Sequence, residues 1–211
     1  MSKLIYMPLH ARASSIRMLL SHGRVEFTDE VISREEFRKR KAQGEFPNGQ
    51  VPVFIHEGRM LNESVAILRL LGKKHGYYPE DDILLAWDAD ATVDYCNEVY
   101  AALYRVHLLG KHTDETKKTY ADKIQALCDF FENKLQKSGT TFICSSKLTI
   151  GDFHLASILF NFIYNDSLGG GEDYTSVGKK IVAEHEALSA YVDRLRAELK
   201  DYLATRGAYP F

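Results

Sequence analysis

The chain has 211 residues, a formal net charge of −2 and a pI near 6.4. This charge argues against a nucleic-acid surface, and no run approaches the ~18 apolar residues of a membrane span. The first residues lack the apolar region of a signal peptide. We therefore expect a cytoplasmic globular protein, with one large or two small domains, and with neither nucleic acid nor membrane as a partner.

Three cysteines, Cys96, Cys128 and Cys144, are widely spaced along the chain. Their number is odd and they form no Cys-x-x-Cys pair, so structural zinc is not expected and a reducing compartment is. We expect buried or half-buried thiols and no metal site.

The first 76 residues predict the order strand, helix, strand, helix, strand, strand, helix. A strand at 4–7 precedes an apolar stripe of helical spacing that ends at Gly23, and a second strand lies within 25–31. Ser33 and Glu36 have the spacing of a capping box. This α/β order resembles the thioredoxin-like fold, although its Cys-x-x-Cys motif is absent.

The stretch 49–64 reads as strand, turn, strand and helix start. Pro52 removes a ladder donor from its strand, which leaves the backbone of Val51 able to pair with a ligand. Ser64 lies at a helix N-terminus, where free N–H groups favour an anion. An edge-strand proline and an ordinary helix cap are the alternatives that local chemistry leaves open.

The string Gly49–Phe54, followed by Asn62–Ile67, resembles the glutathione-site motif of cytosolic glutathione transferases. In that family the proline is cis, the residue before it pairs with the cysteinyl backbone of glutathione, and the serine holds the γ-glutamyl carboxylate. The resemblance implies a set of glutathione-binding residues here, in which Glu63 departs from the glutamine of pi-class enzymes: Gln50, Val51, Pro52, Glu63 and Ser64.

Tyr6 is the predicted catalytic residue. The string 4–20 is similar to the N-terminus of tyrosine-type glutathione transferases, most closely the pi class, with the sigma class as a near relative. The resemblance implies that Tyr6 donates its hydroxyl to the glutathione sulfur and that Arg12 approaches the carboxylates of the peptide. A strand aromatic packed in the core is the alternative for Tyr6.

The free energy needed to activate the glutathione thiol is within the range that one hydrogen bond supplies. Lowering a thiol pKa by about two units requires about 2.7 kcal/mol, and a hydrogen bond to a charged acceptor contributes roughly 1.5–3 kcal/mol. One phenol O–H could supply most of the activation.

The helix predicted over 33–43 carries the contacts to the glycyl end of glutathione. Phe37 stands where the resembling classes have a tryptophan, so an indole donor is lost. Lys41 and Gln43 match the sigma- and pi-class lysines by spacing. We expect Lys41 to bind, because only Lys41 carries a positive charge for the glycyl carboxylate.

A second, all-helical domain is predicted after a short connector. Thr149 and Asp152 have the spacing of a helix-capping box, which resembles the capping box in the second domain of glutathione transferases. We interpret this box as a folding element. Gly169–Gly171 is expected to be a loop. The predicted domains are 1–76 and 83–211 with a linker at 77–82, and the predicted helices are 83–109, 114–137, 152–165 and 186–203.

The segment 90–98 resembles the family segment that reaches the glutathione of a neighbouring subunit. Glu98 is the expected contact, with Asp94 as the alternative and Asn97 as a departure. Tyr104 and Leu9 are expected in the electrophile pocket, although core packing also explains Tyr104. Phe46 is a hypothetical hydrophobic key to a partner subunit.

The resemblance as a whole implies a homodimeric, cytoplasmic glutathione transferase that uses glutathione as co-substrate, without a metal, to conjugate hydrophobic electrophiles in detoxification. Two alternatives share its fold: a glutathione-dependent isomerase or peroxidase, and a non-catalytic ligand-binding or structural relative.

Overall fold

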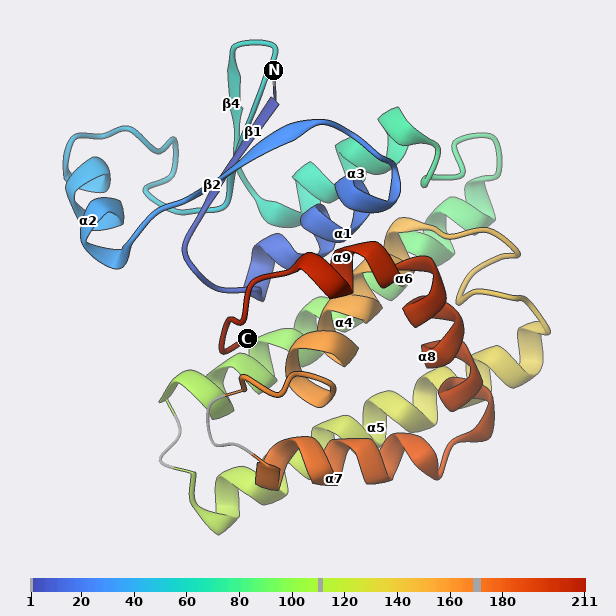
Figure 1. The fold of residues 1–211 in the computed structure, drawn as a ribbon. Helices are drawn as coiled ribbons and strands as arrows, with labels where there is room; N and C mark the ends of the chain where they lie inside the picture. Colours follow the sequence, from blue (N-terminus) through green and yellow to red (C-terminus); the bar gives the residue numbers. More distant parts are fainter. Residues whose placement is uncertain (1, 110–111, 169–171) are drawn as a thin grey trace.

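The computed structural model describes residues 2–109, 112–168 and 172–211. Its first part is a four-stranded sheet in the order β2-β1-β3-β4, with β1 parallel to β2 and the other pairs antiparallel. The predicted element order and the thioredoxin-like α/β fold are confirmed (Figure 1). The elements are β1 (Ser2–Tyr6), α1 (Ser14–His22), β2 (Phe27–Val31), α2 (Arg34–Ala42), β3 (Val53–His56), β4 (Arg59–Leu61) and α3 (Ser64–His75).

The second part is helical, as predicted (Figure 1). Within the described residues, no helix has the length and apolar character needed to cross a membrane. The predicted loop Gly169–Gly171 lies outside the described residues. The elements are α4 (Ile83–Leu109), α5 (Asp114–Ser138), α6 (Ile150–Ile158) with a π-helical continuation (Leu159–Ile163), α7 (Glu172–Ala183), α8 (Glu186–Glu198) and α9 (Lys200–Thr205).

The helical part differs from the sequence prediction in one boundary and one additional helix. The single helix predicted over 186–203 is wrong, because the chain leaves helical geometry at Leu199, between α8 and α9. Helix α7 was not predicted. Its buried stripe contains Tyr174, Gly178 and Val182, and a Cβ at Gly178 would lie 2.6 Å from the hydroxyl oxygen of Tyr120. The apolar residues Tyr174, Val177, Ile181 and Val182 nevertheless repeat at helical spacing, so the sequence did carry a signal for this helix.

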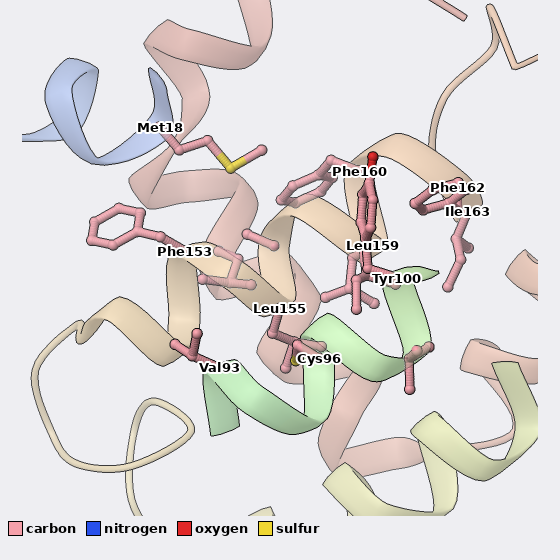
Figure 2. Close-up of a cluster of buried hydrophobic side chains, with 14 of the residues drawn as sticks. Met18, Val93, Cys96, Tyr100, Phe153, Leu155, Leu159, Phe160, Phe162 and Ile163 are labelled. Carbon is pink, nitrogen blue, oxygen red and sulfur yellow. The ribbon is translucent and has the colours of Figure 1, made fainter. Parts of the chain in front are cut away.

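Helix α6 is the centre of the helical part, and every residue from Ile150 to Ile163 is buried. Figure 2 shows Phe153, Leu155 and Leu159 packed among side chains of neighbouring helices, including Cys96 of α4. Burying one such aliphatic or aromatic side chain contributes roughly 1.5–3 kcal/mol. The predicted buried central helix is confirmed.

The capping box at the start of α6 is also confirmed. Asp152 is fully buried and accepts hydrogen bonds from the Thr149 amide (2.7 Å), the Ile143 amide (2.9 Å) and the Tyr191 hydroxyl (2.9 Å). Burial raises the pKa of Asp152, while these donors act in the opposite direction. The carboxylate therefore joins the 140s loop, α6 and α8.

Helix α1 joins the sheet to the helical part. Every residue from Ser14 to Leu20 is buried, and α1 contacts α3 on one side and α6 and α9 on the other. The Ser14 hydroxyl donates to the side-chain oxygen of Asn161 (3.3 Å), and Ser15 Oγ lies 3.4 Å from His154 Nδ1. One continuous hydrophobic core therefore runs through both parts of the chain.

The structure also tests the predictions made for the three cysteines and for Phe46. The three cysteine thiols are free and buried, as predicted. The hypothesis that Phe46 is a key to a partner subunit is wrong, because its side chain is buried in this chain. It packs with Ile5 and Val53 beneath the sheet, and its ring centroid lies 5.7 Å from that of Phe37.

We predict that Asp152→Ala destabilises the protein by about 3–5 kcal/mol, because it leaves buried donors of Thr149, Ile143 and Tyr191 without an acceptor. Chemical denaturation monitored by circular dichroism measures the change. Asp122→Ala removes an exposed carboxylate paired with Lys118 (2.6 Å) and is expected to cost less than about 1 kcal/mol. Equal losses in the two variants would contradict a folding role for Asp152.

Candidate active site

The hydroxyl of Tyr6 is held at the end of β1 by the turn that follows. The Arg12 backbone N–H donates to the Tyr6 hydroxyl oxygen at 3.3 Å. Because that oxygen acts as the acceptor in this bond, its own proton remains available for another group. Tyr6 is buried, with 4% of its surface exposed, yet it lines a cavity.

Tyr6 remains a neutral phenol at physiological pH. Burial raises the pKa of Tyr6 to about 12, although the Arg12 amide and the Arg17 and Arg12 charges act to lower it. Arg17 lies 5.7 Å from the centroid of the Tyr6 ring. The side chain is therefore a hydrogen-bond donor and is not a base.

Arg12 connects the turn after β1 with α4. Its Nη1 donates to the side-chain oxygen of Asn97 at 2.5 Å, and its guanidinium carbon lies 5.0 Å from the centroid of the Tyr100 ring. Tyr104 stacks on Tyr100 with a centroid separation of 6.2 Å. The helical part thus fixes a cation beside the Tyr6 hydroxyl.

The chain before β3 leaves backbone groups outside the sheet. The Val51–Pro52 peptide bond is cis, as the resemblance implied, and the first residue of β3 is Val53. Just upstream, the Asn48 side-chain oxygen accepts a hydrogen bond from the Gln50 N–H (3.2 Å). Val51 therefore lies at the open end of the strand, without a place in its hydrogen-bond ladder.

The start of α3 faces the same region. Ser64 is the first helical residue, and Glu63 before it has a φ of 66°, a conformation that costs energy for a residue with a Cβ. The Glu63 carboxylate accepts a hydrogen bond from the Asn48 side-chain amide (2.9 Å). No described residue bonds the Ser64 hydroxyl. The free N–H groups of a helix N-terminus such as this one favour an anion.

These groups line two cavities that share Arg12, Gln50 and Val51, so the cavities adjoin. The first, of about 280 Å³, is lined by Tyr6, Met7, Arg12, Phe37, Lys41, Gly49, Gln50, Val51, Tyr100 and Tyr104. The second, of about 320 Å³, is lined by Arg12, Asn48, Gln50, Val51, Pro52, Glu63, Ser64 and Asn97.

Four residues considered in the sequence analysis do not line these cavities. Gln43 ends α2 and is exposed, whereas Lys41 lines the first cavity. Leu9 is half-buried, and its carbonyl accepts a hydrogen bond from Arg17 Nη1 (2.7 Å). Glu98, like the alternative Asp94, is exposed on α4.

Sequence reasoning missed Met7, Asn48 and Gly49 in the cavity walls. Asn48 carried a signal, since asparagine side chains commonly bond the backbone two residues further on, as Asn48 does to Gln50. The chain end also lies near the first cavity. Phe211 is buried, and its ring centroid is 5.7 Å from that of Tyr104.

Family models match both parts of the chain. Residues 2–73 match the N-terminal domain of glutathione S-transferase, and residues 94–206 match its C-terminal domain. The chain belongs to the glutathione S-transferase family, a family of transferases whose substrate is glutathione.

Individual relatives are similar at modest identity. The chain is 28% identical to the probable glutathione S-transferase 6 of Caenorhabditis elegans, covering 99% of this chain and 98% of that protein. It is 27% identical to glutathione S-transferase P 1 of Xenopus laevis, covering 95% and 90%.

Solved structures share the fold. The glutathione S-transferase of Ascaris lumbricoides superposes with a TM-score of 0.82 at 22% identity, covering 100% of this chain and 99% of that one. Prostaglandin synthase D of Nilaparvata lugens superposes with a TM-score of 0.76 at 25% identity, covering 98% of both chains.

Proposed function

We propose that this chain activates glutathione as a thiolate through the hydroxyl of Tyr6 and conjugates it to hydrophobic electrophiles, as a cytoplasmic detoxification enzyme. The observation that carries the proposal is the Tyr6 hydroxyl, which accepts from the Arg12 amide and keeps its own proton free at the cavity wall. In the domain division that we propose, 1–76 and 83–211, the glutathione site belongs mainly to the first domain and the electrophile pocket mainly to the second.

Glutathione fits the order of groups along the two cavities. The Ser64 hydroxyl and the first N–H groups of α3 suit the γ-glutamyl carboxylate. Val51, with Gln50 and Pro52 beside it, suits the cysteinyl backbone, while Lys41 and Phe37 suit the glycyl end. Glu63 contributes to glutathione binding indirectly, through its contact with Asn48. The cysteinyl sulfur then reaches the end of the site that holds Tyr6.

The proposed reaction requires no base among these residues. The thiol proton passes to solvent, and the Tyr6 phenol donates a hydrogen bond to the sulfur, which stabilises the thiolate. The sulfur lone pair forms the new carbon–sulfur bond as the electrophile releases its leaving group with the bonding pair. Tyr104 provides the apolar wall for the electrophile, and Leu9 of the turn after β1 does not line this cavity.

We predict that Tyr6→Phe lowers kcat/KM for a halonitroarene by about 10- to 100-fold, the effect of losing one hydrogen bond to a charged sulfur. Steady-state kinetics at neutral pH, with glutathione varied, measure the change. Ser64→Ala is the matched control: it removes a hydroxyl from the same site and is expected to raise the KM for glutathione with little change in kcat. An unchanged kcat in Tyr6→Phe would overturn the role of Tyr6.

Isomerisation is a second candidate, favoured by the similarity to prostaglandin synthase D. The same thiolate would attack and then leave, so glutathione would be regenerated and not consumed. Measuring glutathione consumption alongside product formation decides between the two reactions. Binding without turnover of any electrophile or peroxide would favour a carrier.

We also infer a homodimer, which is supported by exposed apolar side chains on β4, α3, α4 and α5. Trp87 has 66% and Leu84 74% of its surface exposed, and Phe130 lies on the adjacent α5. Exposed apolar surface of this kind is typical of protein interfaces. Its members among the described residues are Met60, Leu70, Ile83, Leu84, Trp87 and Phe130. In such a dimer, Glu98 would contact the γ-glutamyl amine of the partner's glutathione.

We predict that Trp87→Glu shifts the protein to monomers in sedimentation velocity experiments, because it places a charge in the apolar surface.

In the dimer, Glu98→Gln is expected to raise the Kd for glutathione about five- to tenfold in calorimetry. Asp94→Asn removes a carboxylate one turn away and should have little effect. A monomeric wild type would contradict the dimer, and a larger effect of Asp94→Asn would move the contact to Asp94.

A further inference from the structure

Asn97 of α4 holds the guanidinium of Arg12. Among the described residues, only the Asn97 side-chain oxygen accepts a hydrogen bond from this group, at 2.5 Å from Arg12 Nη1. The Arg12 guanidinium carbon also lies 5.0 Å from the centroid of the Tyr100 ring. Asn97 and Arg12 are half-buried, and both line the second cavity of the candidate active site. None of the steps proposed above uses Asn97.

These two contacts hold Arg12 without compensating its charge. An amide oxygen and an aromatic face both attract a guanidinium, but neither carries a full negative charge. No carboxylate of the described residues forms an ion pair with Arg12. Arg17, the other guanidinium beside Tyr6, differs because its Nε and Nη2 donate to the carboxylate of Asp29 (2.8 and 3.1 Å). Of these two cations, Arg12 is therefore the one held by neutral groups.

The other titratable groups around Arg12 leave its charge in place. Glu63 lines the second cavity with Arg12, but its carboxylate accepts its hydrogen bond from the Asn48 amide (2.9 Å). His154 of α6 is neutral at physiological pH, because burial and the charge of Arg12 lower its pKa to about 4. The remaining charged groups that the site discussion placed nearby are exposed, where water and salt screen their charges: Lys41, Asp94 and Glu98.

The charge of Arg12 acts at the place where the glutathione sulfur is expected. The Arg12 backbone N–H donates to the Tyr6 hydroxyl (3.3 Å). Although burial raises the pKa of Tyr6, the charge of Arg12 acts to lower it, so the positive field reaches the Tyr6 oxygen. A sulfur that accepts from this hydroxyl lies in the same field, which favours its negative form.

We propose that Asn97 is a positioning residue that leaves the charge of Arg12 free to act on the glutathione sulfur. This inference rests on the function proposed above, and it adds a second source of thiolate stabilisation to the Tyr6 hydroxyl. A carboxylate at position 97 would hold Arg12 in the same place but would offset its charge. The neutrality of the amide therefore contributes to activation, as well as the position of the guanidinium.

Asn97→Asp tests the proposal, because the new side chain has the same shape and still accepts from Arg12. With glutathione saturating, we expect the thiol pKa of bound glutathione, followed by ultraviolet thiolate absorbance, to rise by about one unit. Conjugation of a halonitroarene should fall about tenfold at a pH below both thiol pKa values, and should approach the wild-type rate at a pH above both. A purely structural role for Asn97 predicts no change in the pH profile, since Arg12 remains held.

Two control variants separate charge from position. Asn97→Ser shortens the side chain without adding a charge, and Tyr100 still contacts Arg12, so the thiol pKa should stay close to the wild-type value. Asn133→Asp makes the same substitution at an exposed position on α5 and should leave the thiol pKa unchanged. Arg12→Gln removes the charge but keeps the backbone N–H, so it decides the matter if Asn97→Asp does not fold. The thiol pKa in Arg12→Gln should rise by at least as much.

The outcomes distinguish this inference from the function on which it rests. An ordinary thiol pKa in wild type would overturn both. A lowered pKa in wild type that is unchanged in Asn97→Asp or in Arg12→Gln would overturn this inference alone. An equal rise in Asn97→Ser and Asn97→Asp would also overturn it, because the position of Arg12 and not its free charge would then set the pKa.

Discussion

The burial of α1 on all sides is the constraint on which the candidate site depends. The helix is enclosed by the sheet and α3 on one side and by α6 and α9 on the other. It therefore cannot shift without disturbing the core that both parts of the chain share. The turn joining β1 to α1 is fixed at both ends, and this turn brings the Arg12 amide to the Tyr6 hydroxyl.

The polar residues of α1 are part of the same constraint. Arg17 has 5% of its surface exposed, pairs with Asp29 of β2 and donates to the Leu9 carbonyl, so it fastens the helix to the sheet and to the turn. Ser14 and Ser15 bond to residues of α6. Because the polar side chains of α1 are buried, a shift of the helix would break their hydrogen bonds and leave polar atoms unpaired away from water. This cost favours a single position of the helix.

The electrostatics of the site follow from this arrangement. Burial keeps Tyr6 in the neutral, proton-bearing form, and two guanidinium groups beside it favour negative charge nearby. The α3 N-terminus adds a second region that favours an anion. The two adjoining cavities therefore suit a ligand with a thiolate at one end and a carboxylate at the other.

Much of the fold was predictable from local chemistry. The Thr149 box, the Gly23 helix end and the order of the first seven elements depend on neighbouring residues, and the structure has them all. Helix α7 was missed although Tyr174, Val177, Ile181 and Val182 repeat at helical spacing. What the sequence could not show is that Gly178 packs against the Tyr120 hydroxyl of α5. The burial of Phe46 was equally non-local, since it depends on how α2 lies against the sheet.

The site was predictable where short motifs carry it, as at Tyr6, Gln50 to Pro52 and Ser64. The candidate site was less predictable from the sequence where α4 meets the first domain. The resemblance assigned Glu98 to the glutathione of a neighbouring subunit, and the adjacent Asn97 lines a cavity of this chain. In the turn after β1, Met7 and not Leu9 lines the first cavity. Adjacent residues on a helix point about 100° apart, so a position one residue away faces a different surface. Such choices are decided by packing between the two parts.

The central claim is that the Tyr6 hydroxyl stabilises a thiolate. The most direct test is the ultraviolet thiolate absorbance of bound glutathione, titrated against pH in wild type and in Tyr6→Phe. The account predicts a thiol pKa about one to two units below that of free glutathione in wild type, returning close to the free value in the variant. A bound thiol with an ordinary pKa in wild type would contradict it.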